Sequence, residues 1–465
     1  MGISTTEAAA TESAKFAQFA LGLALDKVPR NVLELAKAHF LDVLGIGIAS
    51  TGFDYGRVAL QGVRELGEGN QATAIGTGTP LPATSAALLN GVLAHGLDFD
   101  DTHIGGIYHA SAPALAAVLA AGQAARANGR EVLLAFVAAI EIGCRLAVGG
   151  AGEFSRRGFH PTALCGTFAS AAAAGRLSRV DQAALVSALG ICGSMASGVL
   201  EFGASWLKRL HPGWSAHSGL TAVALARAGF LGPDTMFEGG RGFYAAHIQR
   251  IPEGTASPTY QLGQQWHSLG IALKPYPCCH IIHAHVDAAF ELRDQFSIAE
   301  IERIDCPLIR EWHRHVAEPR TDCVRPANAY RALFSVQYVV ALALVRGRVD
   351  LASFYDEPLD DPDVLSVAEK TWVIDDPLSD YPAHFPGEVI VTLKDGRVLR
   401  SRKAASLGTP EVPLPKAELE AKFRSNAMRV IERPASDRLI DLVMKLETLD
   451  SLSEIMSLTV PASAA

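Results

Sequence analysis

The chain has 465 residues, of which 49% are apolar and 19% are charged. This composition excludes a disordered chain, and the length favours two domains over one. Lys and Arg total 41 against 49 Asp and Glu, and no basic stripe interrupts this balance, so we do not expect a nucleic-acid-binding surface.

The first part of the chain reads as a set of helices. Residues up to about 265 are rich in Ala, Leu and Gly, and between Asn31 and Ile48 the residues Ala36, Phe40 and Val43 share one apolar face. The four alanines at 171–174 would let helices approach closely. Further helices are predicted over 84–95, 111–127, 131–148, 162–177, 182–192 and 215–230.

After about residue 265 the pattern changes to mixed helix and strand. Strands are predicted over 301–308 and 371–375, and a hairpin over 388–401 turns at Asp395-Gly396. Helices are predicted over 280–292 and 334–346, then over 417–423 and 436–446, with 461–465 frayed. We therefore expect a mainly α protein, with a large all-helical domain from 1–267 and 405–465 and a smaller α+β lid domain over 268–404.

The cysteines and the apolar segments of the sequence indicate the cellular compartment in which the protein is found. Seven cysteines are present, and the adjacent pair Cys278-Cys279 suits neither a disulfide framework nor a zinc knuckle. The N-terminus lacks a cationic region followed by an apolar stretch, and the longest apolar run, 132–148, is interrupted by Glu141 and Arg145. These features predict a cytoplasmic protein in a reducing compartment, with no membrane partner.

The densest polar cluster lies directly after the helix predicted at 84–95. Three interpretations are open: a solvated helix end, a metal or class II terpene cyclase site built on the Asp-x-Asp-Asp-Thr string, or metal-free acid–base chemistry. The aromatic-rich surroundings of a cyclase are missing, and no second cluster completes a recognised metal spacing. The cluster contains His95, Asp98, Asp100, Asp101, Thr102, His103 and His109.

Three later strings carry isolated polar groups. His160 precedes a predicted helix, where a lone histidine is often structural. Lys208 lies in a short cationic stretch, which is either part of a site or an ordinary surface loop. The third string contains Lys274 and Cys279, but two prolines and the lack of an orienting third group argue against a cysteine nucleophile. Lysines and histidines gathered from several loops suit a small polycarboxylate, and the missing phosphate-loop and dinucleotide fingerprints predict no nucleotide cofactor.

Taken together and in order, the strings HGLDFDDTH, GFHPT, LKRLHPG, LKPYPCCH and FSVQYVVALAL resemble the MmgE/PrpD family over roughly residues 12–450. This family includes 2-methylcitrate dehydratase, cis-aconitate decarboxylase and iminodisuccinate epimerase. The resemblance implies a large helical domain built from both ends of the chain, a smaller α+β lid, and an active site in the cleft between them. It also implies a homodimer that needs no organic cofactor and no metal.

The resemblance also implies a set of site residues. Two departures from the decarboxylases stand out: the loop between Thr102 and His109 is one residue longer, and Cys279 occupies a histidine position. The stretch between Asp101 and Ser111 also differs from the methylcitrate dehydratases. The implied catalytic residues are His160, His109, Asp98, Lys208 and Tyr338, and the substrate-binding candidates are Thr102, Lys274, His283 and Arg209.

The shared chemistry of the family is proton removal or addition at a carbon next to a carboxylate, through an anionic enediolate. We expect His160 or His109 to transfer the proton, with Asp98 orienting a histidine or accepting the proton itself. Lys208 and Lys274 would hold substrate carboxylates, while Tyr338 and Thr102 would donate hydrogen bonds or protonate a leaving group. We rank a dehydratase-type lyase first, an iminodisuccinate-type epimerase second and a decarboxylase third; a catalytically silent binding protein is the alternative of another class.

Overall fold

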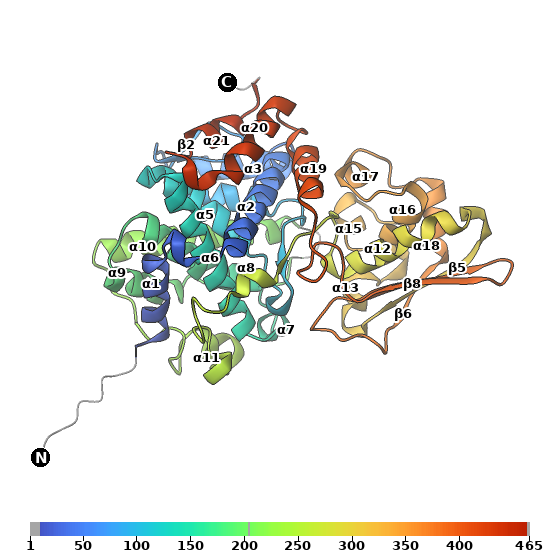
Figure 1. Ribbon diagram of the computed structural model, residues 1–465, viewed down its shortest axis with the longest axis horizontal. Coiled ribbons are helices and arrows are strands. Elements are labelled where there is room, and N and C mark those ends of the chain that lie inside the picture. The colour runs from blue at the N-terminus through green and yellow to red at the C-terminus, as the bar shows by residue number, and fades with distance from the viewer. Residues whose placement is uncertain (1–9, 203–204, 463–465) are drawn as a thin grey trace, which may run out of the picture. The chain divides into compact units, whose positions relative to one another are not determined.

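The computed structural model describes residues 10–202 and 205–462, which form two compact units (Figure 1). The helical unit comprises Met1–Gly96, Gly105–Leu269 and Phe423–Ala465, and the α+β unit comprises Leu97–Ile104 and Gly270–Lys422. The expected fold class, mainly α with a smaller α+β part, is confirmed. The domain limits expected from the sequence remain a prediction. The units differ from them in placing 97–104 and 405–422 with the α+β part and 268–269 with the helical part.

The helical unit consists of helices joined by mostly short connections. Among its described residues, one small hairpin pairs Ala72 with Leu81. Helix α19 (Lys416–Ala427) runs across the boundary between the units. The other elements are α1 (Glu12–Gly22), α2 (Arg30–Ser50), α3 (Asp54–Arg64), β1 (Ala72–Thr73), β2 (Pro80–Leu81), α4 (Ala83–Ala94), α5 (Ser111–Ala125), α6 (Gly129–Gly149), α7 (Glu153–Arg156), α8 (Pro161–Leu177), α9 (Gln182–Cys192), α10 (Leu207–Arg227), α11 (Phe243–Ile248), α20 (Arg433–Met444) and α21 (Ser453–Leu458).

Helix α8 lies at the centre of this unit, packed against α5, α6 and α10. Its alanines at 171–174 are buried, as the small-residue pattern predicted. Helix α10 also crosses α4 so closely that a Cβ on Gly213 would lie 2.3 Å from the carbonyl oxygen of Leu88. Only glycine fits such a backbone contact, and this crossing brings the C-terminal end of α4 toward the first turns of α10.

Helix α6 is the one helix among the described residues that is long and apolar enough to cross a membrane, and 94% of its most apolar window is buried inside the fold. The two charges that interrupt it form an internal ion pair, with Arg145 Nε 2.6 Å from Glu141 Oε1. Arg145 also donates to the carbonyl oxygens of Tyr260 (2.7 Å) and Gln265 (2.6 Å). The buried pair therefore anchors the segment 258–268 on a core helix.

The α+β unit is built on a four-stranded mixed sheet of order β6-β5-β7-β8. Strand β5 is parallel to β6 and antiparallel to β7, and the predicted hairpin pairs β7 with β8 around a turn in which Gly396 has φ +89°. The elements are β3 (Thr102–His103), β4 (Ile271–Ala272), α12 (His283–Leu292), β5 (Ile301–Leu308), α13 (His313–Val316), α14 (Arg320–Val324), α15 (Ala329–Ala332), α16 (Val336–Arg346), α17 (Leu351–Tyr355), α18 (Pro362–Lys370), β6 (Thr371–Asp375), β7 (Gly387–Leu393) and β8 (Val398–Lys403).

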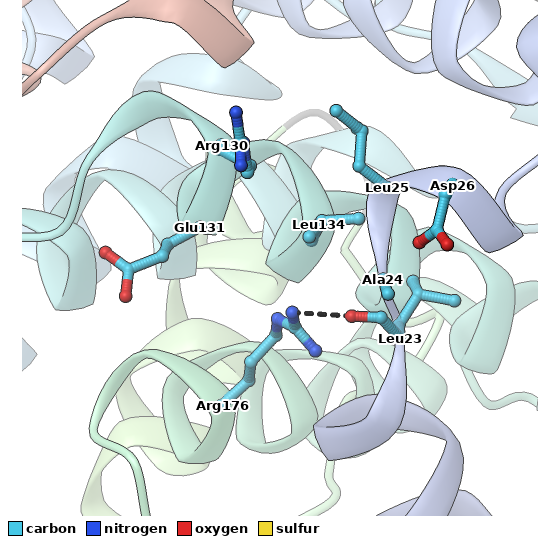
Figure 2. A pocket seen from close by; sticks show the side chains of 8 residues that line it. All are labelled: Leu23, Ala24, Leu25, Asp26, Arg130, Glu131, Leu134 and Arg176. Atoms are coloured by element: carbon cyan, nitrogen blue, oxygen red, sulfur yellow. Dashed lines mark hydrogen bonds between the residues drawn. The ribbon is translucent and has the colours of Figure 1, made fainter.

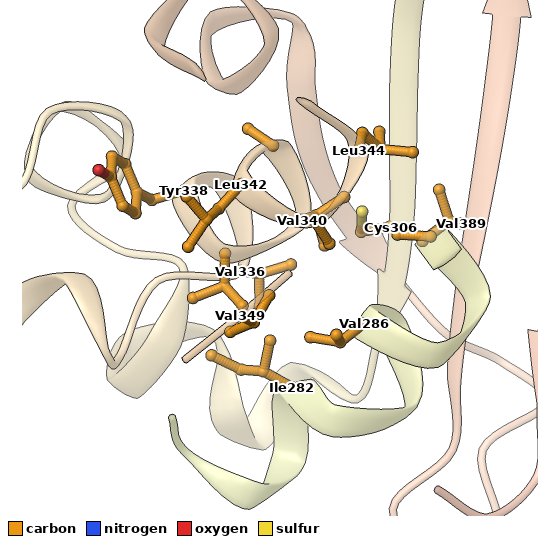
Figure 3. Packing of buried hydrophobic residues seen from close by; sticks show 14 of the residues in the cluster. Ile282, Val286, Cys306, Val336, Tyr338, Val340, Leu342, Leu344, Val349 and Val389 are labelled. Atoms are coloured by element: carbon orange, nitrogen blue, oxygen red, sulfur yellow. The ribbon is translucent and has the colours of Figure 1, made fainter. Parts of the chain in front are cut away.

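An apolar core joins the sheet of this unit to its helices (Figure 3). Val286 of α12 and Val340 of α16 are fully buried, as are Cys306 of β5 and Val389 of β7. In β7, Val389, Val391 and Leu393 are buried and the two residues between them are half-buried, as expected when successive side chains of a strand point to opposite faces.

One expected helix boundary was wrong. Helix α10 was expected to begin after Pro212, at residue 215, but it begins at Leu207 and runs through the proline. A proline inside a helix removes one backbone hydrogen bond. Here Lys208, His211 and Ser215 are all buried on the helix, and this packing outweighs the missing bond. The predicted fraying of 461–465 falls in part on residues 463–465, which lie outside the described residues.

Candidate active site

Four histidines come together inside the helical unit, each placed by a helix end. His95 caps the C-terminus of α4, and His109 precedes α5, where its backbone N–H donates to Thr162 Oγ1 at 3.1 Å. His160 caps the N-terminus of α8, and His211 lies near the start of α10. All four are buried, with exposed fractions between 1% and 8%.

The imidazole rings of these histidines are in contact distance of one another. The ring centroid of His109 lies 4.6 Å from that of His95 and 6.0 Å from that of His160. The Nδ1 atoms of His160 and His211 are 2.8 Å apart, a hydrogen-bond distance. We call His95, His109, His160 and His211 the histidine cluster.

Burial favours the neutral form of two members of the histidine cluster, His160 and His211. Burial is the main cause that lowers the pKa of His160 well below its ordinary range, followed by the neighbouring His211 and Lys208. The same two causes, burial and then Lys208, lower the pKa of His211 to about 4. Neutral imidazoles beside a buried lysine can accept a proton and favour an anion, as an acid–base site for carboxylates requires.

The histidine cluster also has the donor atoms of a metal site. One ring nitrogen from each of His95, His109 and His160 lies within 4.8 Å of the others, close enough for the three to share one metal ion such as zinc. A cation at this point would face the charge of Lys208, which already lowers the pKa of two of the cluster's histidines. The donor set therefore allows a metal, and its electrostatics favour an anion.

Arg209, which we expected to bind substrate, holds the backbone beside the histidine cluster. Its Nε donates to the carbonyl oxygen of Gly96 at 2.6 Å, and its guanidinium lies 4.5 Å from the ring centroid of Tyr55. A Cβ on Gly96 would lie 2.4 Å from both Ser50 Oγ and Tyr55 Oη, so the turn after His95 is tightly enclosed. These contacts assign Arg209 a structural task; substrate binding by Arg209 remains a prediction.

A second polar group lies in the α+β unit, where strand β3 brings the Asp98 segment to Lys274. Thr102 pairs with Ala272, two residues before Lys274. The Nζ of Lys274 donates to the carbonyl oxygen of Asp98 at 2.7 Å and lies 3.7 Å from its carboxylate. Lys274 and Asp98 are 1% and 2% exposed, so this is a buried ion pair. The structure brings three predicted site residues together here.

His283 belongs to the same part of the α+β unit. It is fully buried at the start of α12, with Nε2 3.2 Å from the carbonyl oxygen of Cys278. Burial, followed by the neighbouring His280 and Lys274, lowers its pKa well below the ordinary range. His283 is thus a neutral imidazole that donates through Nε2 and is influenced by the charge of Lys274.

Tyr338 has different surroundings from the other predicted site residues of the α+β unit. It is fully buried in the apolar core, and its hydroxyl has no hydrogen-bond partner among the described residues (Figure 3). Burial raises its pKa, and the charged groups that modify this shift are Arg346, Asp361 and Asp360. Lys274 and Asp98 are not among them, so the catalytic role expected for Tyr338 remains a prediction without a geometric link to that pair.

Two members of the histidine cluster, His95 and His211, were not among the predicted catalytic residues. His95 begins the polar string and His211 belongs to LKRLHPG, so both lie in motifs that the sequence analysis singled out. His211 follows Lys208 by three residues, a spacing that puts both on one face of a helix. The prediction that α10 starts at residue 215 concealed this signal.

A separate surface hollow lies at the other end of α8 (Figure 2). Its lining includes Leu23, Glu131 and Arg176, and the guanidinium of Arg176 donates to the carbonyl oxygens of Ala20 and Leu23. The 17 residues of α8 separate it from His160 by about 25 Å. Arg176 there caps the end of α1, and nothing links the hollow to the histidine cluster.

A mainly helical protein with a buried histidine–lysine cluster, joined to an α+β unit with a buried lysine–aspartate pair, has the features of a proton-transfer enzyme for anionic substrates. The MmgE/PrpD N-terminal domain matches residues 14–252, and the MmgE/PrpD C-terminal domain matches residues 276–448. The chain belongs to the MmgE/PrpD family and thereby to enzymes that act on carboxylates.

Several curated relatives match almost the whole chain. The cis-aconitate decarboxylase of Mus musculus is 31% identical, over 96% of this chain and 93% of its own. The cis-aconitate decarboxylase of Homo sapiens is 30% identical, over 96% and 94%. The cis-aconitate decarboxylase of Aspergillus terreus is 26% identical, over 96% and 95%.

Proposed function

We propose that this protein is a cofactor-independent lyase that removes a proton next to a carboxylate of a small di- or tricarboxylate. The histidine cluster is the observation that carries the proposal, because four buried imidazoles beside Lys208 supply both a neutral base and a positive charge. General acid–base assistance of this kind contributes typically ~10²–10⁴-fold to a rate.

In the proposed reaction, His160 or His109 accepts the proton from carbon, and the electron pair enters the neighbouring carboxylate as an enediolate. Lys208 stabilises the charge that develops, since a positioned cation acts most strongly where water is excluded. Within the α+β unit, Lys274 would bind a carboxylate once the carboxylate of Asp98 is displaced or protonated. Thr102 would donate a hydrogen bond.

The first candidate reaction is dehydration of a 2-methylcitrate-type hydroxy acid. After proton loss the enediolate re-forms the carboxylate, the β-hydroxyl leaves with a proton from an acid, and a double bond remains between the two carbons. Cys279, at a position where the decarboxylases have a histidine, supports a reaction other than theirs.

The second candidate is decarboxylation of cis-aconitate, which the names of the curated relatives favour. In that reaction the carbon–carbon bond to one carboxylate breaks, carbon dioxide leaves, and a histidine protonates the resulting carbanion. Both candidates use the same histidines and the same cations, but a histidine is the base in the dehydration and the proton donor in the decarboxylation. They also differ in which bond the enzyme aligns for cleavage.

The test is proton NMR in heavy water with 2-methylcitrate, citrate, cis-aconitate and both stereoisomers of iminodisuccinate. A new vinyl signal from a hydroxy acid supports the dehydratase, and itaconate from cis-aconitate supports the decarboxylase. Deuterium incorporation without net conversion of iminodisuccinate indicates an epimerase. Saturable turnover of any of these dismisses a silent binding protein.

The residue assignment is tested with the double variant His160→Ala/Lys208→Ala, for which we expect turnover to fall at least ~10²-fold. The matched control is His217→Ala/Arg227→Ala, which removes the same kinds of side chain from other faces of α10. The proposal fails if the first double variant retains wild-type turnover on the substrate that the NMR panel identifies.

A further inference from the structure

The contact between His160 and His211 is the least expected feature of the histidine cluster. Their Nδ1 atoms are 2.8 Å apart, and both rings are 4% exposed. Hydrogen bonds hold the backbone of both residues: the N–H of His160 donates to the carbonyl oxygen of Gly198 at 3.0 Å, and the carbonyl oxygen of His211 accepts from Ser215 Oγ at 2.9 Å. The two residues are 51 positions apart in the chain.

A hydrogen bond between two Nδ1 atoms requires one proton between them. One ring donates and the other accepts, and this uses the Nδ1 atom of both rings. The Nε2 atom is then the only ring nitrogen of His160 left for chemistry. When His160 donates through Nδ1, its Nε2 carries a lone pair and is a base.

We infer that His211 is a positioning residue for His160, holding the tautomer in which Nε2 is the base and sharing the positive charge after proton transfer. The inference rests on the proposed function. When the substrate C–H bond breaks, its electron pair stays on the substrate and the proton forms an N–H bond at Nε2 of His160. The Nδ1 proton can then shift toward Nδ1 of His211, which spreads the charge over two rings.

The surroundings of the pair leave His211 as the acceptor for this proton. His95 and His109 face His160 from the end of α4 and from the segment before α5, and Lys208 faces both rings of the pair from α10. Burial and Lys208 keep His211 neutral near pH 7, so its Nδ1 can accept. The repulsion by which His211 lowers the pKa of His160 arises only when His211 is itself protonated, and it is absent while His211 is neutral. A hydrogen bond from a protonated imidazole to a neutral acceptor stabilises the protonated form.

The first test compares His211→Leu, which removes the acceptor, with His211→Asn, which keeps a side-chain oxygen near the Nδ1 position. We expect kcat to fall about 10- to 100-fold in His211→Leu, at or below the lower end of the ~10²–10⁴-fold that acid–base assistance supplies, because His160 itself remains. The acidic limb of the kcat/KM profile should move to lower pH by about one unit, because the base loses the group that stabilises its charged form. His211→Asn should keep that limb near its wild-type position.

The matched control is His217→Leu, a second histidine on α10, whose Nδ1 contacts the carbonyl oxygen of Thr84 at 3.2 Å. This variant should change neither kcat nor the pH profile. Equal losses in His211→Leu and His211→Asn with an unmoved acidic limb would reduce His211 to a packing residue and overturn the inference. An unmoved limb with wild-type kcat in His211→Leu would overturn it equally.

A second measurement needs no substrate and separates this inference from the proposed function. In enzyme labelled with ¹⁵N-histidine, the Nδ1 shifts of His160 and His211 should report one shared proton, and both signals should change together in a pH titration. His211→Leu should release the Nδ1 of His160. If the two rings titrate independently, the pair is refuted even when turnover is present. If the pair is seen but His160→Ala keeps full turnover, the proposed base fails and the pairing stands.

Discussion

Lowering the pH from 7 to 5 should destabilise the helical unit through His211. Burial holds its pKa at about 4 in the folded protein against an ordinary 6.5, so the unfolded chain binds more protons over this range. Stability then rises with pH: the contribution is complete above pH 6.5 and is lost as the pH falls toward 4. For these two values the loss at pH 5 is about 2 kcal/mol from His211 alone, and His160 adds to it in the same direction.

Hydrogen exchange of peptides from α8 and α10, followed at pH 5, 6 and 7, measures this loss as a fall in the free energy of opening. His211→Leu should be less stable at pH 7 because its hydrogen bond is gone, yet its stability should depend less steeply on pH. His217→Leu should keep the wild-type dependence. The reasoning is refuted if the wild-type protein opens with the same free energy at pH 5 and 7, or if His211→Leu keeps the full slope.

Three further outcomes are expected. Arg145→Met should lower the free energy of unfolding by about 3–5 kcal/mol, because it leaves Glu141 as an unpaired buried charge, whereas Arg130→Met at the start of the same helix should have little effect in the same urea titration. Gly213→Ala should destabilise by more than about 1 kcal/mol, since its Cβ has no room against α4, while Gly62→Ala, with open space around it, should be neutral or stabilising by up to about 1 kcal/mol; equal effects would contradict the close crossing. Excess EDTA should leave turnover unchanged and added Zn²⁺ should slow it by occupying the histidine cluster; loss of activity on chelation would mean that the metal-free chemistry is wrong.

The expected homodimer is open to a direct measurement. Sedimentation velocity of the full chain should give a species of twice the 49.3 kDa protomer mass. A monomer at micromolar concentration would contradict this expectation.

Much of the fold could be predicted from the sequence where an element is long and regular. The predicted ranges match for α9, β5 and β6, and helices such as α2 and α6 were found within a few residues at each end. The two-residue strands β3 and β4 were not predicted, because so short a pairing between distant segments leaves no periodic pattern in the sequence.

The candidate site was predicted in its residue types and less well in its contacts. His160 and Lys208 stand in recognisable strings, but the pairing of His160 with His211 depends on how α8 and α10 cross, and Gly219 of α10 makes the close contact with Ser170 and Ala171 of α8 there. Likewise the carbonyl oxygen of Asp98 as the partner of Lys274 follows from backbone geometry, with Asp98 at φ 52°, and side-chain identity gives no sign of it.

The segment 97–104 belongs to the α+β unit although the chain on both sides of it belongs to the helical unit. A fragment limited to 270–422 would therefore lack β3, remove Ile104 from the apolar core and leave the ammonium group of Lys274 without its carbonyl acceptor. Lys422 would lose its acceptor as well, the carbonyl oxygen of Phe99 at 3.0 Å. A fragment cut at the ends of 270–422 would thus be unstable. An α+β unit expressed on its own has to include the eight residues 97–104, for instance through circular permutation.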